Sequence, residues 1–349
     1  MHAANHTSPP LAFAFTGRGS EYFRIWIVNL ALTLLTLGIY SAWAKVRRLQ
    51  YFYRNTALNG ASFDYHGEPL AILKGRLIGV GLLVAYQFSG GLGPVAGLVA
   101  LAALLILLPW LAQRSLRFKL ANSSYRGLRF QFAGRPGGAY QAFLLWPALG
   151  YLTAGLLFPL AHWQIKRFQH NHSRYGATSF ALRTGAGGFY GLYAKALGLF
   201  MLPLLIGLGV GYAVIMTNGL DFEDKQAVIT FGLGLLVLVY LLAMLLIGPW
   251  FSARLQNLVW NGTGLGEHGF ASTVQARALT AITLTNFLGI VLTLGLYKPF
   301  ADIRLAKYRL EHMALLPAGD LEAFIADQTQ SVGAAGEETA ELFDLDISF

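Results

Sequence analysis

The sequence predicts an all-α polytopic membrane protein with internal repeats, in which short β-hairpins form a cytoplasmic layer. Only 12% of its 349 residues are charged, against about 25% in soluble domains. The segments 77–113, 196–218 and 226–253 contain no Asp, Glu, Lys, Arg or His. Runs of about 18 or more such residues are typical of membrane spans. This composition excludes a soluble enzyme, a disordered chain and a secreted disulfide scaffold.

Seven apolar segments follow one another, and four of them are predicted to form two transmembrane helical hairpins. Segment 77–113 would be about 55 Å long as a helix, too long for one crossing of a ~30 Å hydrocarbon core. The Gly- and Pro-containing break at 89–94 splits it, and the second hairpin turns at the acidic segment 218–224. The seven segments are 25–44, 70–88, 94–112, 142–163, 196–217, 226–250 and 278–297.

Three further apolar helices, in segments 25–44, 142–163 and 278–297, either span the membrane or re-enter it. Each has a basic residue at both ends, and helix breakers stand at Gly38, Pro159 and Gly295. Re-entrance places 25 of the 26 Lys and Arg residues in the cytoplasm, whereas seven spans place 17 there, so the positive-inside rule favours re-entrance. Seven spans would instead give an inverted repeat of the transporter type. The C-terminus is predicted to be cytoplasmic.

An internal repeat is the strongest pattern in the sequence. The motif of residues 43–69 returns at 110–136, and weaker copies begin at Asn171 and Asn261. Asn59-Gly60 predicts a two-residue type I′ β-hairpin, flanked by alternating apolar residues. The glycines aligned with Gly60 are Gly127, Gly176 and Gly266.

The repeats divide the chain into five predicted segments. An N-terminal strand segment (1–21) precedes membrane repeat one (22–139) and membrane repeat two (140–276). A partial third repeat (277–312) leads to an acidic C-terminal tail (313–349).

A second repeated motif supplies the candidate residues for a cavity in the apolar segments. Asn29 with residues 36–40 returns as Asn286 with residues 293–297, and the glycine of each copy is predicted to interrupt its helix. A cavity lined by the Asn and Tyr side chains would favour transport. The matching place in the middle of the chain holds residues 155–159, where the motif is lost. The candidate residues are Asn29, Thr36, Gly38, Tyr40, Trp43, Asn286, Thr293, Gly295 and Tyr297.

Charge predicts a basic cytoplasmic face and an acidic tail. The net charge is +9, yet the residues after Ala314 hold eight acids and no Lys or Arg. Residues 343–349 alternate between apolar and polar side chains, which predicts a strand that adds to the cytoplasmic hairpins or docks on another protein. A basic face at a bilayer favours contact with anionic headgroups. The arginines predicted to bind headgroups or the tail are Arg47, Arg48, Arg114, Arg117 and Arg126.

Several of these motifs resemble a known family. Phe13-x-Phe15-x-Gly17, residues 36–47 and residues 51–56 are similar to the YjgN-like family of bacterial inner-membrane proteins, a domain of unknown function. The resemblance covers nearly the whole chain and implies a multi-pass protein of the bacterial inner (cytoplasmic) membrane. It supplies no catalytic residue. It also implies a membrane-associated protein partner such as a metallopeptidase.

Motifs for catalysis, cofactors and metals are not found, so we expect no enzyme, no cofactor and no metal site. His170-x-His172 lacks a third ligand, and the chain has no cysteine. The bilayer explains the basic charge, so nucleic acid is not an expected partner. Two functions remain. The first is a permease or channel-like protein for small or amphipathic solutes, whose substrate the sequence does not identify. The alternative is a non-catalytic scaffold that binds anionic lipid and a protein partner through its basic cytoplasmic face.

Overall fold

Ten strands close into one antiparallel barrel. The computed structural model describes residues 9–218 and 225–331. Each strand pairs with its neighbours along the chain, and β1 pairs with β10 to complete the ring, with Leu11 opposite Leu315. The strands are β1 (Leu11–Phe15), β2 (Thr56–Leu58), β3 (Ala61–Tyr65), β4 (Ser123–Tyr125), β5 (Leu128–Phe132), β6 (Ser173–Tyr175), β7 (Thr178–Leu182), β8 (Thr263–Leu265), β9 (His268–Ser272) and β10 (Met313–Leu316).

The prediction of an all-α fold is therefore wrong. The predicted hairpins exist, but they are walls of a barrel and not separate loops at the membrane surface. Strands of three to five residues carry little periodic signal of their own. Closure also needs a pair about 300 residues apart in sequence, β1 with β10, and no local pattern reveals such a pair.

The helices are inserted between the strands as five groups, one in each strand–helices–strand unit of the chain. The groups join β1 to β2, β3 to β4, β5 to β6, β7 to β8 and β9 to β10. In the same order, they are α1 (Gly19–Leu35) with α2 (Ser41–Arg54); α3 (Pro69–Ser89), η1 (Gly90–Leu92) and α4 (Pro94–Ala121); α5 (Pro136–Tyr140), η2 (Gln141–Leu145), α6 (Trp146–Leu152) and α7 (Phe158–Asn171); α8 (Ala186–Asn218) with α9 (Lys225–Trp260); and α10 (Ala276–Leu292) with α11 (Lys298–Glu311).

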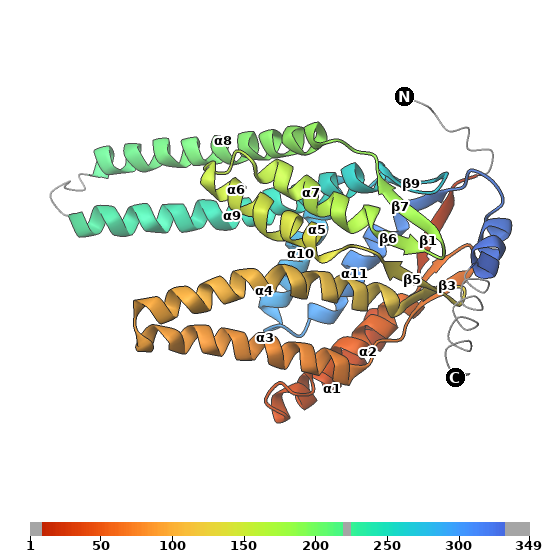
Figure 1. Ribbon diagram of the computed structural model, residues 1–349. Helices are drawn as coiled ribbons and strands as arrows, with labels where there is room; N and C mark the ends of the chain where they lie inside the picture. The colour runs from red at the N-terminus through yellow and green to blue at the C-terminus, as the bar shows by residue number, and fades with distance from the viewer. Residues whose placement is uncertain (1–8, 219–224, 332–349) are drawn as a thin grey trace.

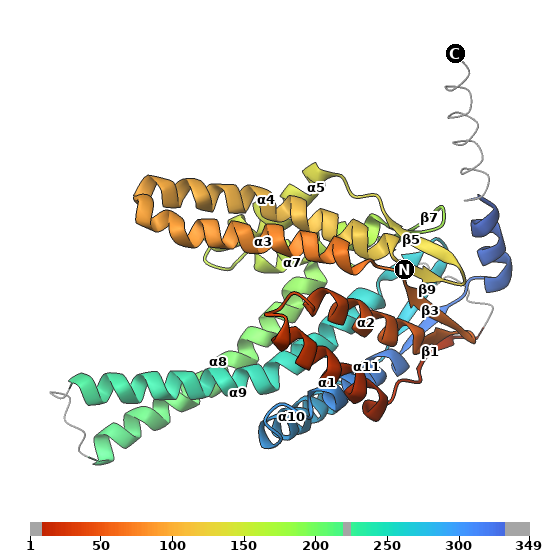
Figure 2. The same ribbon diagram turned by 90° about the horizontal axis from the view of Figure 1, so that it is seen from below.

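All five helical groups leave the barrel at the same end (Figure 1), because the strands are antiparallel and helical groups alternate along the chain with the short turns at the other end. The α3–α4 and α8–α9 hairpins extend furthest and diverge from one another (Figure 2). A further helix, residues 321–331, lies at the opposite end of the barrel (Figure 1). We call it the cap helix.

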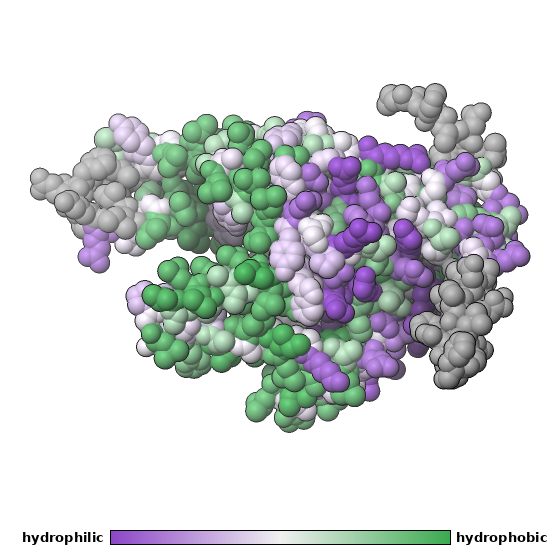
Figure 3. Space-filling view, viewed as in Figure 1, coloured by the Kyte–Doolittle hydropathy of each residue, from purple (hydrophilic) through white to green (hydrophobic). Residues whose placement is uncertain are grey.

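Within residues 9–218 and 225–331, four helical stretches are long and apolar enough to cross a membrane, and they form the two hairpins predicted from the sequence. Apolar residues cover the end of the molecule that the two hairpins form, whereas hydrophilic residues gather nearer the barrel (Figure 3). Outward-facing apolar side chains of this kind are expected where lipid replaces water. The stretches are Pro69–Leu92, Pro94–Ala121, Ala186–Ala213 and Thr230–Trp260.

The barrel turns are of two kinds. Asn59 and Gly60 both have positive φ, 46° and 75°, and Arg126 and Gly127 repeat this with 48° and 81°, as the predicted type I′ turn requires. In the third and fourth turns the first residue is Gly176 or Gly266, and within those two turns only that glycine has positive φ, as in a type II′ turn. The predicted alignment of these two glycines with Gly60 was therefore wrong by one residue.

The predicted interruptions at the two repeated glycines are confirmed. Gly38, with φ of 93°, lies between α1 and α2, and Gly295, with φ of 96°, lies between α10 and α11. The hydroxyl oxygen of a threonine two residues earlier caps each turn, accepting from the N–H of Tyr40 or Tyr297 at 2.9 Å.

The same turn occurs in the middle of the chain, between α6 and α7. Gly155 has φ of 93°, and Thr153 Oγ1 accepts from the N–H of Leu157 at 3.2 Å. The geometry is therefore kept at Thr153-Ala154-Gly155, two residues before the place where the sequence alignment sought it. The prediction that the middle copy departs from the others is correct for its amino-acid sequence but wrong for its backbone conformation.

Candidate functional site

A ring of five phenylalanines surrounds the barrel axis. Each five-residue strand contributes one, because side chains on a strand point alternately inward and outward. The ring centroids lie 6.2 Å apart between Phe13 and Phe63, 6.4 Å between Phe63 and Phe130, 6.4 Å between Phe130 and Phe180, and 6.1 Å between Phe180 and Phe270. We call these residues the phenylalanine ring; they are Phe13, Phe63, Phe130, Phe180 and Phe270.

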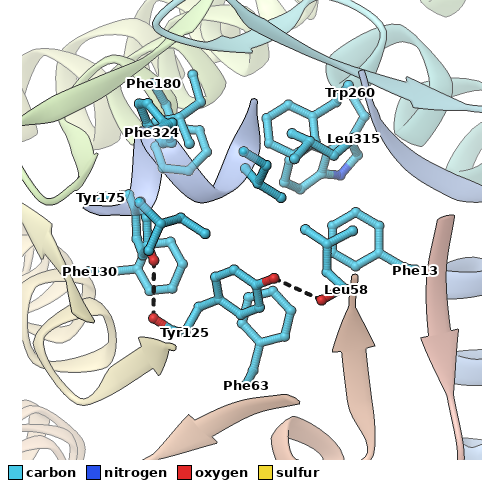
Figure 4. A pocket seen from close by; sticks show the side chains of 14 residues that line it. Phe13, Leu58, Phe63, Tyr125, Phe130, Tyr175, Phe180, Trp260, Leu315 and Phe324 are labelled. Carbon is cyan, nitrogen blue, oxygen red and sulfur yellow. Dashed lines mark hydrogen bonds between the residues drawn. The ribbon is translucent and has the colours of Figure 1, made fainter. Parts of the chain in front are cut away.

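Beyond this ring lies an apolar cavity of about 170 Å³, which we call the lumen (Figure 4). The three- and four-residue strands supply its second layer of side chains. The two tyrosines in that layer turn their hydroxyl groups to the backbone: Tyr125 donates to the Leu58 carbonyl at 2.7 Å, and Tyr175 donates to the Tyr125 carbonyl at 3.1 Å. The second layer is Leu58, Tyr125, Tyr175, Leu265 and Leu315.

The cap helix closes the lumen at the end away from the membrane helices. Leu321, Phe324 and Ile325 contribute to the lumen wall. Polar contacts fix the helix and the residues just before it to the first three turns of the barrel and to the start of β9. Arg126 forms an ion pair with Glu322; Asn59 Nδ2 donates to Glu322 at 3.3 Å; the N–H groups of Ala177 and Thr178 donate to Gln328 Oε1 at 2.9 and 3.1 Å; and the Ala318 N–H donates to His268 Nδ1 at 3.1 Å.

A second cavity of about 450 Å³, the vestibule, lies on the opposite side of the phenylalanine ring. It shares Phe63, Phe130, Phe180 and Trp260 with the lumen, so these four side chains form the wall between the two spaces. The vestibule differs from the lumen because polar groups line it. They belong to Tyr53, Lys119, Ser123, Gln169, His170 and Ser173.

Burial keeps the histidine of the vestibule neutral. Burial, with a smaller contribution from the nearby Lys166 cation, lowers the pKa of His170 from its ordinary value of 6.5 to about 4. Its Nδ1 lies 3.2 Å from Thr263 Oγ1, and its ring meets Trp260 edge to face. Burial lowers the pKa of Lys166 as well, and the Lys119 cation adds to that effect.

We expect acid to destabilise the protein through His170. Between pH 6.5 and 4 the unfolded chain takes up a proton at this residue while the folded protein does not, so stability falls as pH falls. The loss of thermal stability between pH 7 and 5 should therefore be smaller in His170→Gln than in the wild type. His66→Gln is the control, because His66 lies outside the lumen and vestibule linings. Equal losses in wild type and His170→Gln would contradict the expectation.

A third cavity, about 600 Å³ in volume, lies between α2, α3 and α4 and is basic. Its cations are Lys45, Arg76, Arg114 and Arg117, and none of the described residues that line it is an Asp or Glu. Arg76 donates to the Ser41 hydroxyl. Burial, and then the cations of Arg76 and Lys119, lower the pKa of Lys45. Like charges that meet without a carboxylate provide a binding site for an anion. We call this space the basic cavity.

Comparison with known proteins places the chain in a family. It matches a family model described as a bacterial protein of unknown function, DUF898, over residues 10–342. The chain belongs to the DUF898 family. It is therefore a member of the family that the sequence motifs resembled.

Relatives of this DUF898 chain include the inner membrane protein YjgN of Escherichia coli K12, which is 32% identical over 151 residues. That match covers 43% of this chain and 38% of the relative. YjgN of Salmonella typhimurium is 33% identical over 132 residues, or 37% of this chain and 31% of the relative. The chain thus spans under two fifths of these relatives' length, and no solved structure matches it. The relatives and the four apolar stretches support an integral protein of the inner membrane.

The predicted cavity motif of this DUF898 protein does not gather around a cavity. Asn29, Tyr40, Asn286 and Tyr297 line none of the lumen, the vestibule and the basic cavity. Asn286 Nδ2 donates to the Ala301 carbonyl at 3.3 Å and so ties α10 to α11. Asn29 is buried on α1, and its Oδ1 has no partner among the described residues. Trp43 stacks on Tyr40 with ring centroids 6.0 Å apart.

The five predicted arginines do not form one surface. Arg114 and Arg117 line the basic cavity. Arg47 lies over the Tyr40 ring at 5.7 Å, Arg48 lies 3.5 Å from Asp302 on α11, and Arg126 pairs with Glu322 beyond the far end of the barrel. The predicted strand at 343–349 falls outside the described residues.

The phenylalanine ring is the main feature that the sequence analysis missed. Each of the five phenylalanines belongs to one copy of the repeat motifs. Each lies two residues after the first residue of its strand. Five such strands, each followed by a helical group, were the available signal. Among residues 9–218 and 225–331, no three His, Asp or Glu side chains come together as possible metal ligands.

Proposed function

We propose that this DUF898 protein binds an anionic amphiphile of the cytoplasmic leaflet in its basic cavity, as part of the transport of amphipathic solutes at the inner membrane. The observation that carries the proposal is the set of four cations around about 600 Å³, with no carboxylate among the described lining residues. The cavity lies where α3 begins and α4 ends, at the barrel end of an apolar hairpin. A phosphate there would meet Arg76, Arg114 and Arg117 while acyl chains followed the helices.

The proposed topology places the barrel in the cytoplasm, with the C-terminus, and makes the α1–α2, α6–α7 and α10–α11 groups re-entrant. Both ends of each group connect to the barrel, which supports this arrangement. Helix α1 has 17 residues, about 25 Å, which is short for a ~30 Å core. Leu37 and Leu294 at the tips are 95% and 96% exposed, as a lipid-facing turn requires. The shared turns at Gly38, Gly155 and Gly295 support an internal repeat.

We expect the double variant Arg76→Gln/Arg114→Gln to bind phosphatidylglycerol about thirtyfold more weakly, since each cation near an anionic headgroup contributes about 1 kcal/mol. The measurement is native mass spectrometry of the full-length protein titrated with phosphatidylglycerol, with phosphatidylcholine as the uncharged comparison. The matched control is Arg129→Gln/Arg174→Gln, which removes two exposed cations from the barrel strands. Equal loss in both double variants would show that net charge, and not the basic cavity, governs binding.

A non-catalytic scaffold is the second candidate function. It is favoured by the cap helix, because Leu321, Phe324 and Ile325 cover the far end of the lumen. A protein partner, such as a membrane-associated metallopeptidase, remains a proposal from the family resemblance. Phosphatidylglycerol binding that depends on Arg76 and Arg114, but no change in solute uptake by the same variant in cells, would favour the scaffold.

A further inference from the structure

The lumen and the vestibule are two chambers of opposite character that share one aromatic wall. The lumen is lined by apolar side chains, and the vestibule carries a cation, an amide and an imidazole. We propose that together they bind a small amphipathic carboxylic acid, with its ring or short alkyl group in the lumen and its carboxylate at Lys119. This site is separate from the basic cavity, so either proposal can fail without the other.

The size of the lumen fits one aromatic ring. Its volume is about 170 Å³, and a cavity of about 150 Å³ lined by Leu, Ile and Phe stays dry and binds benzene. The surrounding phenylalanines offer both faces and edges, and aromatic rings pair in offset or edge-to-face geometry. Phe63 and Tyr125 already stack in the lumen wall, with centroids 4.7 Å apart.

The lumen cannot also hold the carboxylate. The hydroxyl groups of Tyr125 and Tyr175 are occupied by carbonyl oxygens at 2.7 and 3.1 Å. An ionised group there would lose its hydration without gaining a hydrogen bond, which is strongly unfavourable. The charged end of the ligand therefore has to remain on the vestibule side of the phenylalanine ring.

The vestibule offers unused polar groups for that charged end. Among the described residues, Lys119 Nζ and the Gln169 side-chain amide form no hydrogen bond or ion pair, and no carboxylate lines the vestibule. The hydroxyls of Ser123 and Ser173 are engaged, donating to the carbonyls of Lys119 and Gln169 at 2.8 and 2.7 Å. Lys119 is thus the cation that a carboxylate would meet, and Gln169 a donor beside it.

The cap helix decides from which side the ligand enters. It closes the lumen at the far end and is fixed there by Glu322 and Gln328. The vestibule lies on the side of the membrane helices, between residues of α2, α4, α7 and α9. A ligand therefore enters ring first from the level of the membrane surface, where amphipathic acids accumulate.

The test compares 4-phenylbutyrate with 4-phenylbutanol, which keeps the ring and lacks the charge. Full-length protein in phosphatidylcholine nanodiscs is titrated with each compound by ligand-observed NMR, and empty nanodiscs give the partition background. We expect the acid to bind about tenfold more tightly than the alcohol, the usual effect of a hydrogen bond to a charged group. Butyrate, which lacks the ring, should not bind above background.

Two variants separate the chambers. Lys119→Gln should abolish the preference for the acid while the alcohol still binds, whereas Lys74→Gln, an exposed cation outside the vestibule lining, should keep the preference. Leu265→Phe fills the lumen and should remove binding of both compounds. Leu265→Ala enlarges the lumen and should retain binding, so that filling is distinguished from disruption of the barrel.

Three outcomes would overturn the proposal. One is 4-phenylbutyrate binding to the wild type no more than to empty nanodiscs. Another is equal binding to the wild type and to a folded Leu265→Phe, which would place the ring outside the lumen. The third is an acid preference that survives in Lys119→Gln.

Discussion

Replacing Phe130 by alanine is expected to lower the free energy of unfolding by about 3 kcal/mol, the lower end of the usual range for Phe→Ala because the ring is only half-buried. Phe130 contacts Tyr175, Phe63 and Phe180 at centroid distances of 5.1, 6.4 and 6.4 Å and belongs to the wall between lumen and vestibule. Its loss would leave a cavity in that wall and remove one ring contact from each of Tyr175, Phe63 and Phe180. The measurement is equilibrium unfolding by SDS titration in mixed micelles.

The matched control is Phe88→Ala on α3. Phe88 is 73% exposed and lies at the end of an apolar helix, where lipid or detergent contacts it in place of protein. Its removal should change the free energy of unfolding by about 0.5 kcal/mol or less, as expected for an exposed position. If Phe88→Ala cost as much as Phe130→Ala, the phenylalanine ring would not be the centre of the folded core.

Cysteine labelling in intact cells is expected to give an all-or-none difference between Gly91→Cys and Ala177→Cys. Gly91 lies at the tip of the α3–α4 hairpin, where a Cβ meets nothing within 4 Å, and Ala177 lies in an exposed barrel turn at the opposite end of the molecule. An impermeant maleimide added outside should label Gly91→Cys and not Ala177→Cys. The chain contains no cysteine, so every signal comes from the introduced residue.

Permeabilised cells supply the control for this experiment, because both variants should then be labelled. Labelling of Ala177→Cys in intact cells would place the barrel outside the cytoplasm and remove the proposed topology. Labelling of neither variant in intact cells, with both labelled after permeabilisation, would mean that the α3–α4 tip does not reach the outer surface.

Local signals predicted the pieces of this fold but not their assembly. Asn59-Gly60 identified a hairpin because both positions need positive φ, and Gly38 identified a helix break for the same reason. The break at Gly155 was missed because Ala154 and Leu156 stand where the first copy of the motif has leucine and isoleucine. Thr153 nevertheless caps the turn as the other threonines do. In such turns, the glycine that takes up the positive φ predicts the helix break better than the residues around it.

The candidate site depended on non-local pairing and was out of reach of the sequence. Phe13 and Phe270 come from opposite ends of the chain and line the same lumen only because β10 lies between β1 and β9. Of the predicted arginines, Arg114 and Arg117 do line a cavity, but Lys45 and Arg76, which complete its cation set, belong to two other helices. The distribution of charge along the sequence predicted a basic face. Only the packing of α2, α3 and α4 determines which of its cations line the basic cavity.

The pairing of the first strand with the last has a consequence for biosynthesis. Strand β1 ends at Phe15 and β10 begins at Met313, so at 5–20 residues per second the first strand waits about 15–60 s for its second neighbour. Throughout that time the nascent chain carries an open sheet edge, which is a template for wrong pairing. A ribosome that stops before Met313 would release a chain in which the edges of both β1 and β9 stay open, and such truncated products should be substrates for membrane proteases.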